Sequence, residues 1–118
     1  MYTIKKEFHF SASHQLLQMP DWHPCARLHG HNYVVVIELQ SETLDQYGFV
    51  RDYLELKAFK DYIDEQLDHR HLNEVLGDAC TTAERLARHL FDWACARWPE
   101  VSAVSVSETP KTWAEYRP

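Results

Sequence analysis

The residues best suited to chemistry are gathered in one short stretch, Cys25-Ala26-Arg27-Leu28-His29-Gly30-His31, and at the isolated His14. Two histidines separated by one residue point to the same side of an extended strand, because strand side chains alternate between faces. His29 and His31 could therefore bind one metal ion, with His14 as a third ligand from the opposite arm of a hairpin. Three neutral imidazoles hold zinc and leave a fourth position for water or substrate, which is typical of a catalytic site.

Cys25 precedes the histidine pair by a few residues and allows more than one interpretation. Close to the three histidines but outside them, its thiol would serve as an acid/base group. As a fourth zinc ligand it would close the site and make it structural. Cysteine is also common as a small buried apolar side chain, but a loop position between Pro24 and Arg27 argues against that. Cys80 and Cys95 lack such neighbours and are expected to be structural.

Asp68 and His69 form a second candidate pair, at the end of a helix predicted from residue 52 onward. A neighbouring carboxylate orients an imidazole and raises its basicity, and the C-terminus of a helix favours the protonated ring. Taken alone, the pair is better explained as a surface aspartate and a histidine at an exposed helix end. Beside a zinc site and a free thiol, it indicates a proton relay.

Glu108 is a carboxylate at the end of a valine-rich strand. It could accept two N–H groups from a guanidine-like heterocycle, or it could simply be a solvated strand end. Thr82 is expected in the first turn of a helix, where its hydroxyl and the free amides could hold a polar ring. Arg27 and Lys111 are the cations that lie nearest to these candidate residues in the sequence. Either could meet a phosphate, or both could be surface residues.

Composition limits the possible classes of protein. The chain has 118 residues, 45% of them hydrophobic, and a formal net charge of −6. This length predicts a single domain, residues 1–118, with a core of its own. The acidic balance argues against non-specific nucleic-acid binding, which needs a basic surface. Three cysteines without framework spacing predict reduced thiols in the cytoplasm. No stretch resembles a leader peptide or a membrane span.

The patterns along the chain predict strands and two amphipathic helices. Alternation and β-branched residues predict strands at 2–10, 31–40, 48–50, 101–108 and 113–116, with a functional loop at 11–28. Asp52 and Glu55 resemble a capping box that starts the first helix, and Thr81 is the expected N-cap of the second. The predicted fold class is α+β, an antiparallel sheet with two helices packed on one face. The free edges of such a sheet favour oligomerisation.

Four motifs, taken together, resemble a known family. They are Phe8-His9-Phe10-Ser11-Ala12-Ser13-His14, Cys25 to His31, Leu67-Asp68-His69-Arg70-His71-Leu72-Asn73, and Glu108-Thr109-Pro110. In this order they resemble 6-carboxy-5,6,7,8-tetrahydropterin synthase, the queuosine branch of the 6-pyruvoyltetrahydropterin synthase family. The resemblance implies the tunnelling (T) fold and a homo-oligomer that pairs two trimers. It also implies a zinc-dependent lyase that converts 7,8-dihydroneopterin triphosphate to 6-carboxytetrahydropterin, acetaldehyde and triphosphate.

The resemblance also assigns roles to particular positions. His14, His29 and His31 match the zinc ligands, and Cys25, Asp68 and His69 match the proton-transfer group. Glu108 matches the pterin anchor, and Thr82 matches a threonine that contacts the pterin. The Cys-x-x-x-His-Gly-His spacing is similar to the queuosine branch. Two alternatives stay open: a 6-pyruvoyltetrahydropterin synthase, which eliminates triphosphate without breaking the carbon chain, and a zinc-binding module without catalytic activity.

Overall fold

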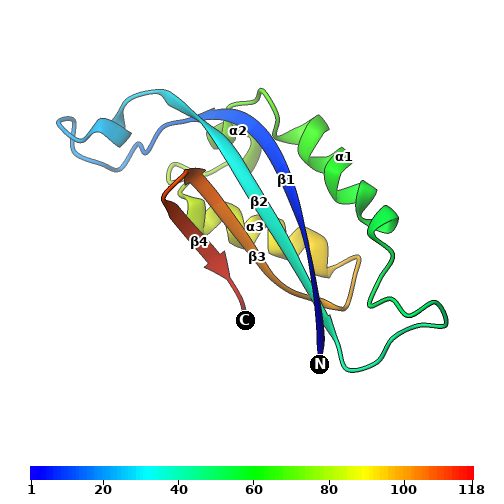
Figure 1. The fold of residues 1–118 in the computed structure, drawn as a ribbon. Helices are drawn as coiled ribbons and strands as arrows, with labels where there is room; N and C mark the ends of the chain where they lie inside the picture. The colour runs from blue at the N-terminus through cyan, green and yellow to red at the C-terminus, as the bar shows by residue number, and fades with distance from the viewer.

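The centre of the molecule is a four-stranded antiparallel sheet, seen in a computed structural model that describes residues 1–118 (Figure 1). The strands lie side by side in their order along the chain: β1 (Tyr2–His14), β2 (His29–Ser41), β3 (Val101–Thr109) and β4 (Thr112–Tyr116). The helices cover one face of this sheet: α1 (Lys57–Gln66), the short α2 (Leu72–Leu76) and α3 (Ala83–Cys95). We call the covered face the inner face and the opposite one the outer face. The α+β class is confirmed, and α2 adds to the two predicted helices.

The β1–β2 hairpin is longer than predicted. Its two strands pair from Tyr2 opposite Ser41 to His14 opposite His29. The β-branched run at 34–37 favours an extended conformation in β2. Residues 11–14 were expected in a loop because their small and polar side chains carry little strand propensity. Backbone pairing with the start of β2 nevertheless extends β1 to His14.

The predicted short strand at 48–50 is wrong, because this segment forms a turn. The Asp45 side chain accepts the backbone N–H groups of Tyr47 at 2.8 Å and Phe49 at 3.0 Å. Gly48 has a φ of +86°, in the left-handed region that favours glycine. Local hydrogen bonds from an aspartate thus replace sheet pairing here.

Both predicted helix starts need correction. The Asp52 carboxylate accepts the Leu54 N–H, but the turn it caps is a 3₁₀ turn, η2 (Tyr53–Leu56), and α1 begins after that turn. The N-cap of α3 is Thr82 rather than Thr81, since the Thr82 hydroxyl accepts the Arg85 N–H at 3.2 Å. Thr81 is instead buried, with 1% of its surface exposed.

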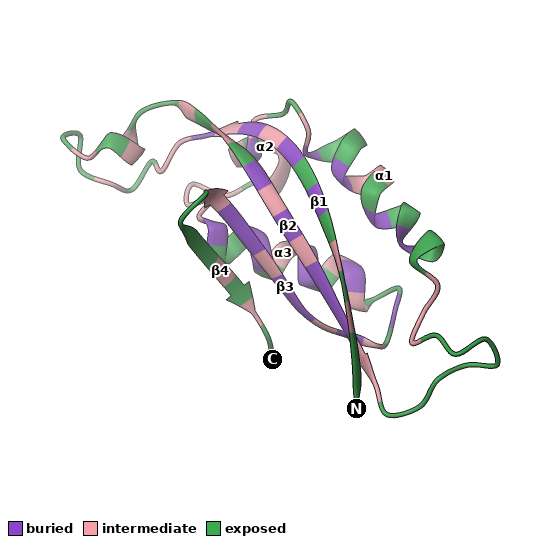
Figure 2. Cartoon of the chain, viewed as in Figure 1, coloured by how far each residue is buried: buried purple, intermediate pink, exposed green.

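The core lies between the helices and the inner face of the sheet. Figure 2 shows buried residues alternating with more exposed ones along β1 and β2. The predicted apolar stripe of the first helix is confirmed, and every member is at most 1% exposed: Leu56, Phe59, Ile63 and Leu67. Leu86, Leu90 and Ala94 of α3 are fully buried as well. Burying each large side chain stabilises the fold by roughly 1.5–3 kcal/mol relative to leaving it exposed.

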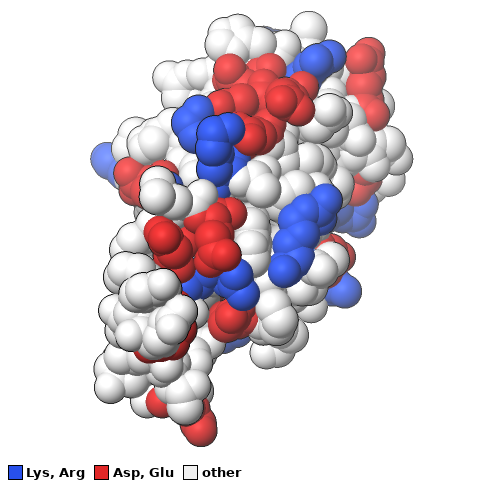
Figure 3. Space-filling model, turned by 90° about the vertical axis from the view of Figure 1, so that its right-hand side faces the viewer, with Lys and Arg blue, Asp and Glu red and all other residues white.

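The two edges of the sheet are formed by β1 and β4. Residues 69–71 cover the end of the β1 edge, where the His69 N–H donates to the Ser11 carbonyl and the Ser13 N–H to the Arg70 carbonyl. β4 forms the other edge of the sheet. Acidic and basic side chains are interspersed on the face shown in Figure 3. None of the helices is both long enough and apolar enough to cross a membrane.

Candidate metal centre and active site

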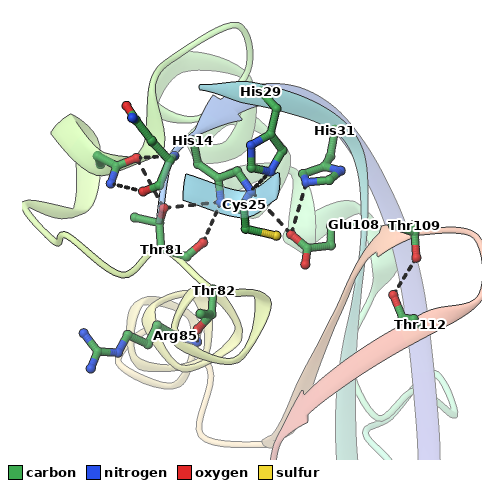
Figure 4. Close-up of polar contacts among 12 residues, drawn as sticks. His14, Cys25, His29, His31, Thr81, Thr82, Arg85, Glu108, Thr109 and Thr112 are labelled. Atoms are coloured by element: carbon green, nitrogen blue, oxygen red, sulfur yellow. Dashed lines mark hydrogen bonds and ion pairs between the residues drawn. The ribbon is translucent and has the colours of Figure 1, made fainter. Parts of the chain in front are cut away.

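Three histidines meet at the end of the β1–β2 hairpin. Backbone pairing sets His14 directly opposite His29, and His31 follows two positions later on the same side of β2. One ring nitrogen from each histidine lies within 4.8 Å of the other two (Figure 4). His14 is almost completely buried, whereas His29 and His31 are half-buried. The structure therefore brings together the three residues predicted as metal ligands.

Backbone carbonyls orient two of the rings. His14 Nδ1 donates to the Thr81 carbonyl at 2.8 Å, and His29 Nδ1 donates to the Arg27 carbonyl at 2.7 Å. Since a carbonyl only accepts, these bonds place the hydrogen of each neutral ring on Nδ1 and a lone pair on Nε2. The two Nε2 atoms are 2.9 Å apart. Two lone pairs at this distance repel each other unless a cation or a proton lies between them, so the donor set fits a metal ion.

The surroundings also favour the neutral form of the His14 and His31 rings. Burial lowers the pKa of His14 and of His31, and the neighbouring His29 lowers both further. Glu108 opposes both shifts, and the hydrogen bond to the Thr81 carbonyl opposes that of His14, but the net shift of each pKa is downward. Neutral imidazole is the form that binds a metal. The net pKa shifts of His14 and His31 are thus consistent with metal binding.

Glu108, at the end of β3, lies against this cluster. Its Oε2 is 3.5 Å from His31 Nε2 and 3.7 Å from His14 Nε2. The same oxygen is buried and has no hydrogen-bond partner. Glu108 also lines a pocket of about 240 Å³ with Ala83 at the start of α3 and Thr112 and Trp113 in β4. A buried acceptor without a donor is costly, so this carboxylate is suited to receive N–H groups from a bound molecule.

Cys25 lies in a 3₁₀ turn, η1 (Pro24–Ala26), and Figure 4 shows it beside the cluster. The turn is held in place, because the Cys25 N–H donates to His23 Nδ1 and its carbonyl accepts the Leu16 N–H. The half-buried thiol is not among the three ligand atoms that lie within 4.8 Å of one another. Figure 4 shows the sulfur pointing to the side where Glu108 lies. This position suits a group that exchanges protons with a molecule held at the cluster.

Asp68 and His69 form the expected pair. Asp68 Oδ2 is 2.9 Å from His69 Nδ1, while Asp68 Oδ1 accepts the Ser11 N–H at 2.9 Å. The Ser11 N–H and then His69 lower the pKa of Asp68, so the carboxylate stays ionised. His69 has a φ of +59° and an exposed ring. The left-handed backbone of a histidine is unusual, and here it lets the His69 N–H reach the Ser11 carbonyl.

This pair faces the outer side of the hairpin. His69 lines a pocket of about 420 Å³ with Ser11, Ser13 and Asn32, whose positions alternate with those of His14 and His31 along the strands. His31 also borders this pocket, whereas Cys25 and Glu108 do not. Within one chain, the structure thus places Glu108 and Cys25 at the histidine cluster and the Asp68–His69 pair on the other side of the hairpin.

The remaining predicted residues contribute less directly. The Thr82 hydroxyl caps α3. Arg27 is exposed, and its backbone carbonyl is the group that reaches the site. Sequence reasoning missed Thr81, which holds His14 through its backbone carbonyl. Residue type does not reveal such a role, because every residue has a carbonyl.

Comparisons with known proteins agree with this geometry. Residues 3–118 match the model of the family described as 6-pyruvoyl tetrahydropterin synthase. The chain is 36% identical over 122 residues to the 6-carboxy-5,6,7,8-tetrahydropterin synthase of Synechocystis sp., covering 98% of this chain and 93% of that protein. The corresponding enzyme of Bacillus subtilis is 29% identical over 126 residues, covering 99% and 86%.

A solved structure extends the likeness to three dimensions. The 6-pyruvoyl tetrahydropterin synthase of Caenorhabditis elegans superposes with a TM-score of 0.87 at 27% identity, covering 99% of this chain and 95% of that one. The expected T-fold is thereby confirmed. With a family match over nearly its whole length, the chain belongs to the 6-pyruvoyl tetrahydropterin synthase family.

Proposed function

We propose that this protein is a zinc-dependent lyase of queuosine biosynthesis, which converts 7,8-dihydroneopterin triphosphate to 6-carboxy-5,6,7,8-tetrahydropterin, acetaldehyde and triphosphate. The observation that carries the proposal is the cluster of His14, His29 and His31, with the unpartnered carboxylate oxygen of Glu108 beside it. Relatives named 6-carboxytetrahydropterin synthase support the queuosine branch. Three free cysteines are consistent with the reducing cytoplasm.

The proposed chemistry follows from the residues at the cluster. A bound zinc ion would act as a Lewis acid toward the side-chain oxygens of the substrate. Glu108 accepts the N–H groups of the aminopyrimidine edge, because an ionised carboxylate matches two parallel donors. The Cys25 thiolate removes a proton from the side chain of the substrate. A general acid or base in such a role typically contributes roughly 10²–10⁴-fold to the rate.

The Asp68–His69 pair would transfer the proton on the opposite face of the substrate. Because this pair lies on the outer side of the hairpin, we propose that a second copy of the chain supplies it. The sheet has two edges at which copies could pair. This arrangement accords with the expected hexamer of two trimers. We assign Thr82 a contact with the pterin, and Arg27 a contact with the triphosphate.

The decisive experiment is to incubate the zinc-loaded protein with 7,8-dihydroneopterin triphosphate and to measure acetaldehyde together with the pterin product. We expect acetaldehyde and 6-carboxytetrahydropterin in equal amounts. Release of triphosphate without acetaldehyde would identify a 6-pyruvoyltetrahydropterin synthase, the activity named for the C. elegans neighbour. If neither acetaldehyde nor triphosphate is released, the result would favour a zinc-binding module without catalytic activity. The position of the Cys25 thiol outside the three-ligand cluster speaks against a closed four-ligand site.

A further inference from the structure

Asn73, in the first turn of α2, joins two other segments of the chain through its side-chain amide. Its Oδ1 accepts the Gln15 N–H at 2.9 Å and the Thr81 hydroxyl at 3.4 Å. Its Nδ2 donates to the Gln15 carbonyl at 2.7 Å and to the Asp78 carbonyl at 3.1 Å. These partners determine which way the amide faces, since an N–H needs an acceptor and the two carbonyls need donors.

The contacts of Asn73 converge on His14. Gln15 is the next residue in the chain, so Asn73 holds the backbone just beyond His14 by both its N–H and its carbonyl. The Thr81 carbonyl accepts the His14 Nδ1 hydrogen, and the Thr81 hydroxyl lies 3.3 Å from the same nitrogen. Asn73 therefore fixes both the backbone that carries the His14 ring and the residue that orients this ring.

We propose that Asn73 is a positioning residue for the metal centre, which directs His14 Nε2 toward His29 and His31 without binding the ion itself. The inference rests on the proposed metal function of the histidine cluster. Loss of the groups that orient a ligating histidine typically weakens metal affinity about 10–100-fold. The competing explanation is that Asn73 only ties α2 to the end of β1 and contributes stability.

The test compares Asn73→Ala with Arg51→Ala. Arg51 is a matched control because its guanidinium also joins distant segments of the chain, through Glu100, but has no link to the histidines. Zinc affinity is measured by competition with a chromophoric chelator, and the metal geometry by the visible absorption spectrum of the cobalt-substituted protein. We expect Asn73→Ala to bind zinc about 10–100-fold more weakly and to alter the cobalt spectrum. Arg51→Ala should lower only the melting temperature.

A second measurement keeps the proposal separate from the metal function. In the metal-free protein, the ¹⁵N chemical shifts of the His14 ring report which nitrogen carries the hydrogen. We expect the Nδ1–H tautomer in the wild type and a mixture of tautomers in Asn73→Ala.

If Asn73→Ala does not fold, a second variant is available. Thr81→Val removes the bridging hydroxyl, keeps the carbonyl, and should weaken zinc binding several-fold. Unchanged zinc affinity, cobalt spectrum and tautomer in a folded variant would overturn the proposal. A wild type that binds no zinc but shows the tautomer change would overturn the metal function alone.

Discussion

The Cys25 thiol and the Glu108 carboxylate approach the same three histidines from different elements, η1 and β3. Neither belongs to the compact set of ligand nitrogens. Their proposed roles are therefore distinct from metal binding: Cys25 transfers a proton, and Glu108 binds the heterocycle. Substitutions at these two residues should leave the metal content intact and change different kinetic or binding constants.

For Cys25→Ala, we expect the zinc content and the fold to be retained and kcat to fall by roughly 10²–10⁴-fold, because a proton-transfer group is lost. Zinc per chain is measured by atomic emission, and turnover by acetaldehyde release. Cys95→Ala is the control, since Cys95 lies at the end of α3 and should leave both quantities unchanged. Loss of zinc from Cys25→Ala would make the thiol a ligand and favour the structural site.

For Glu108→Gln, we expect binding of a pterin that does not react, such as biopterin, to weaken by about 2–5 kcal/mol. The amide presents a donor where the aminopyrimidine edge needs an acceptor. The affinity is measured by fluorescence titration of wild type and variant. Glu115→Gln makes the same change of charge on the exposed edge strand β4 and should bind normally. Equal affinities of wild type and Glu108→Gln would remove Glu108 from the binding site.

At the scale of elements, the features that could be predicted from the sequence are those set by the spacing of nearby residues. The apolar stripe of α1 and the alternation of β2 follow from helix and strand periodicity, and the shared side of His29 and His31 follows from their spacing. The residue at which β1 ends and the hydrogen bonds that orient His14 could not be predicted in this way. Thr81 and His14 are 67 positions apart in the chain, and Asn73 and Gln15 are 58 apart. Such contacts exist only after the helices have packed on the sheet.

His89 joins α3 to α1 and makes the stability of this contact depend on pH. Its Nε2 lies 2.6 Å from the Tyr62 hydroxyl, and burial lowers its pKa below 6.5, with Asp92 opposing the shift. Between the lowered pKa and 6.5 the unfolded chain binds more protons than the folded one, so stability rises with pH there. The contribution of His89 is therefore present above pH 6.5 and is lost as the pH falls through that window.

We accordingly expect the melting temperature of the metal-free protein to fall on acidification below pH 6.5, and to fall less steeply in His89→Gln. One group changes the free energy of unfolding by at most about 1.4 kcal/mol per pH unit. Thermal unfolding at a fixed protein concentration from pH 8 to pH 5 measures both slopes. His14 and His31 shift in the same direction but are present in both proteins. Parallel curves would show that His89 does not titrate in this window.

At the scale of the whole molecule, the chain is elongated, with extents of 55 × 25 × 24 Å. The proposed catalytic groups lie on both sides of its sheet, with Cys25 at the histidine cluster and His69 in the outer pocket. We propose that each active site takes Cys25 from one copy and the Asp68–His69 pair from another. Two variants that are each inactive alone can then form some intact active sites when they assemble together.

We expect Cys25→Ala and His69→Ala, each nearly inactive alone, to regain activity when they assemble together. Random mixing of equal amounts leaves about a quarter of the shared sites with both groups intact, because each copy contributes one group independently in a symmetric assembly. Coexpression with two affinity tags isolates the mixed oligomers, and the acetaldehyde assay measures their turnover. Doubly tagged oligomers without regained activity would place both groups of a site in one chain.

The pairing of His14 with His29 has a consequence for the loop between them. This loop, residues 15–28, projects from the body of the molecule (Figure 1), and the exposed Arg27 is its single lysine or arginine. A bound ion would fasten the base of the loop, and removing it leaves two facing lone pairs that push the hairpin arms apart. We expect trypsin to cut after Arg27 several-fold faster in the metal-free protein, as followed by mass spectrometry. The ion would then protect the chain from proteolysis as well as serve its chemistry, and equal cleavage rates would refute this protection.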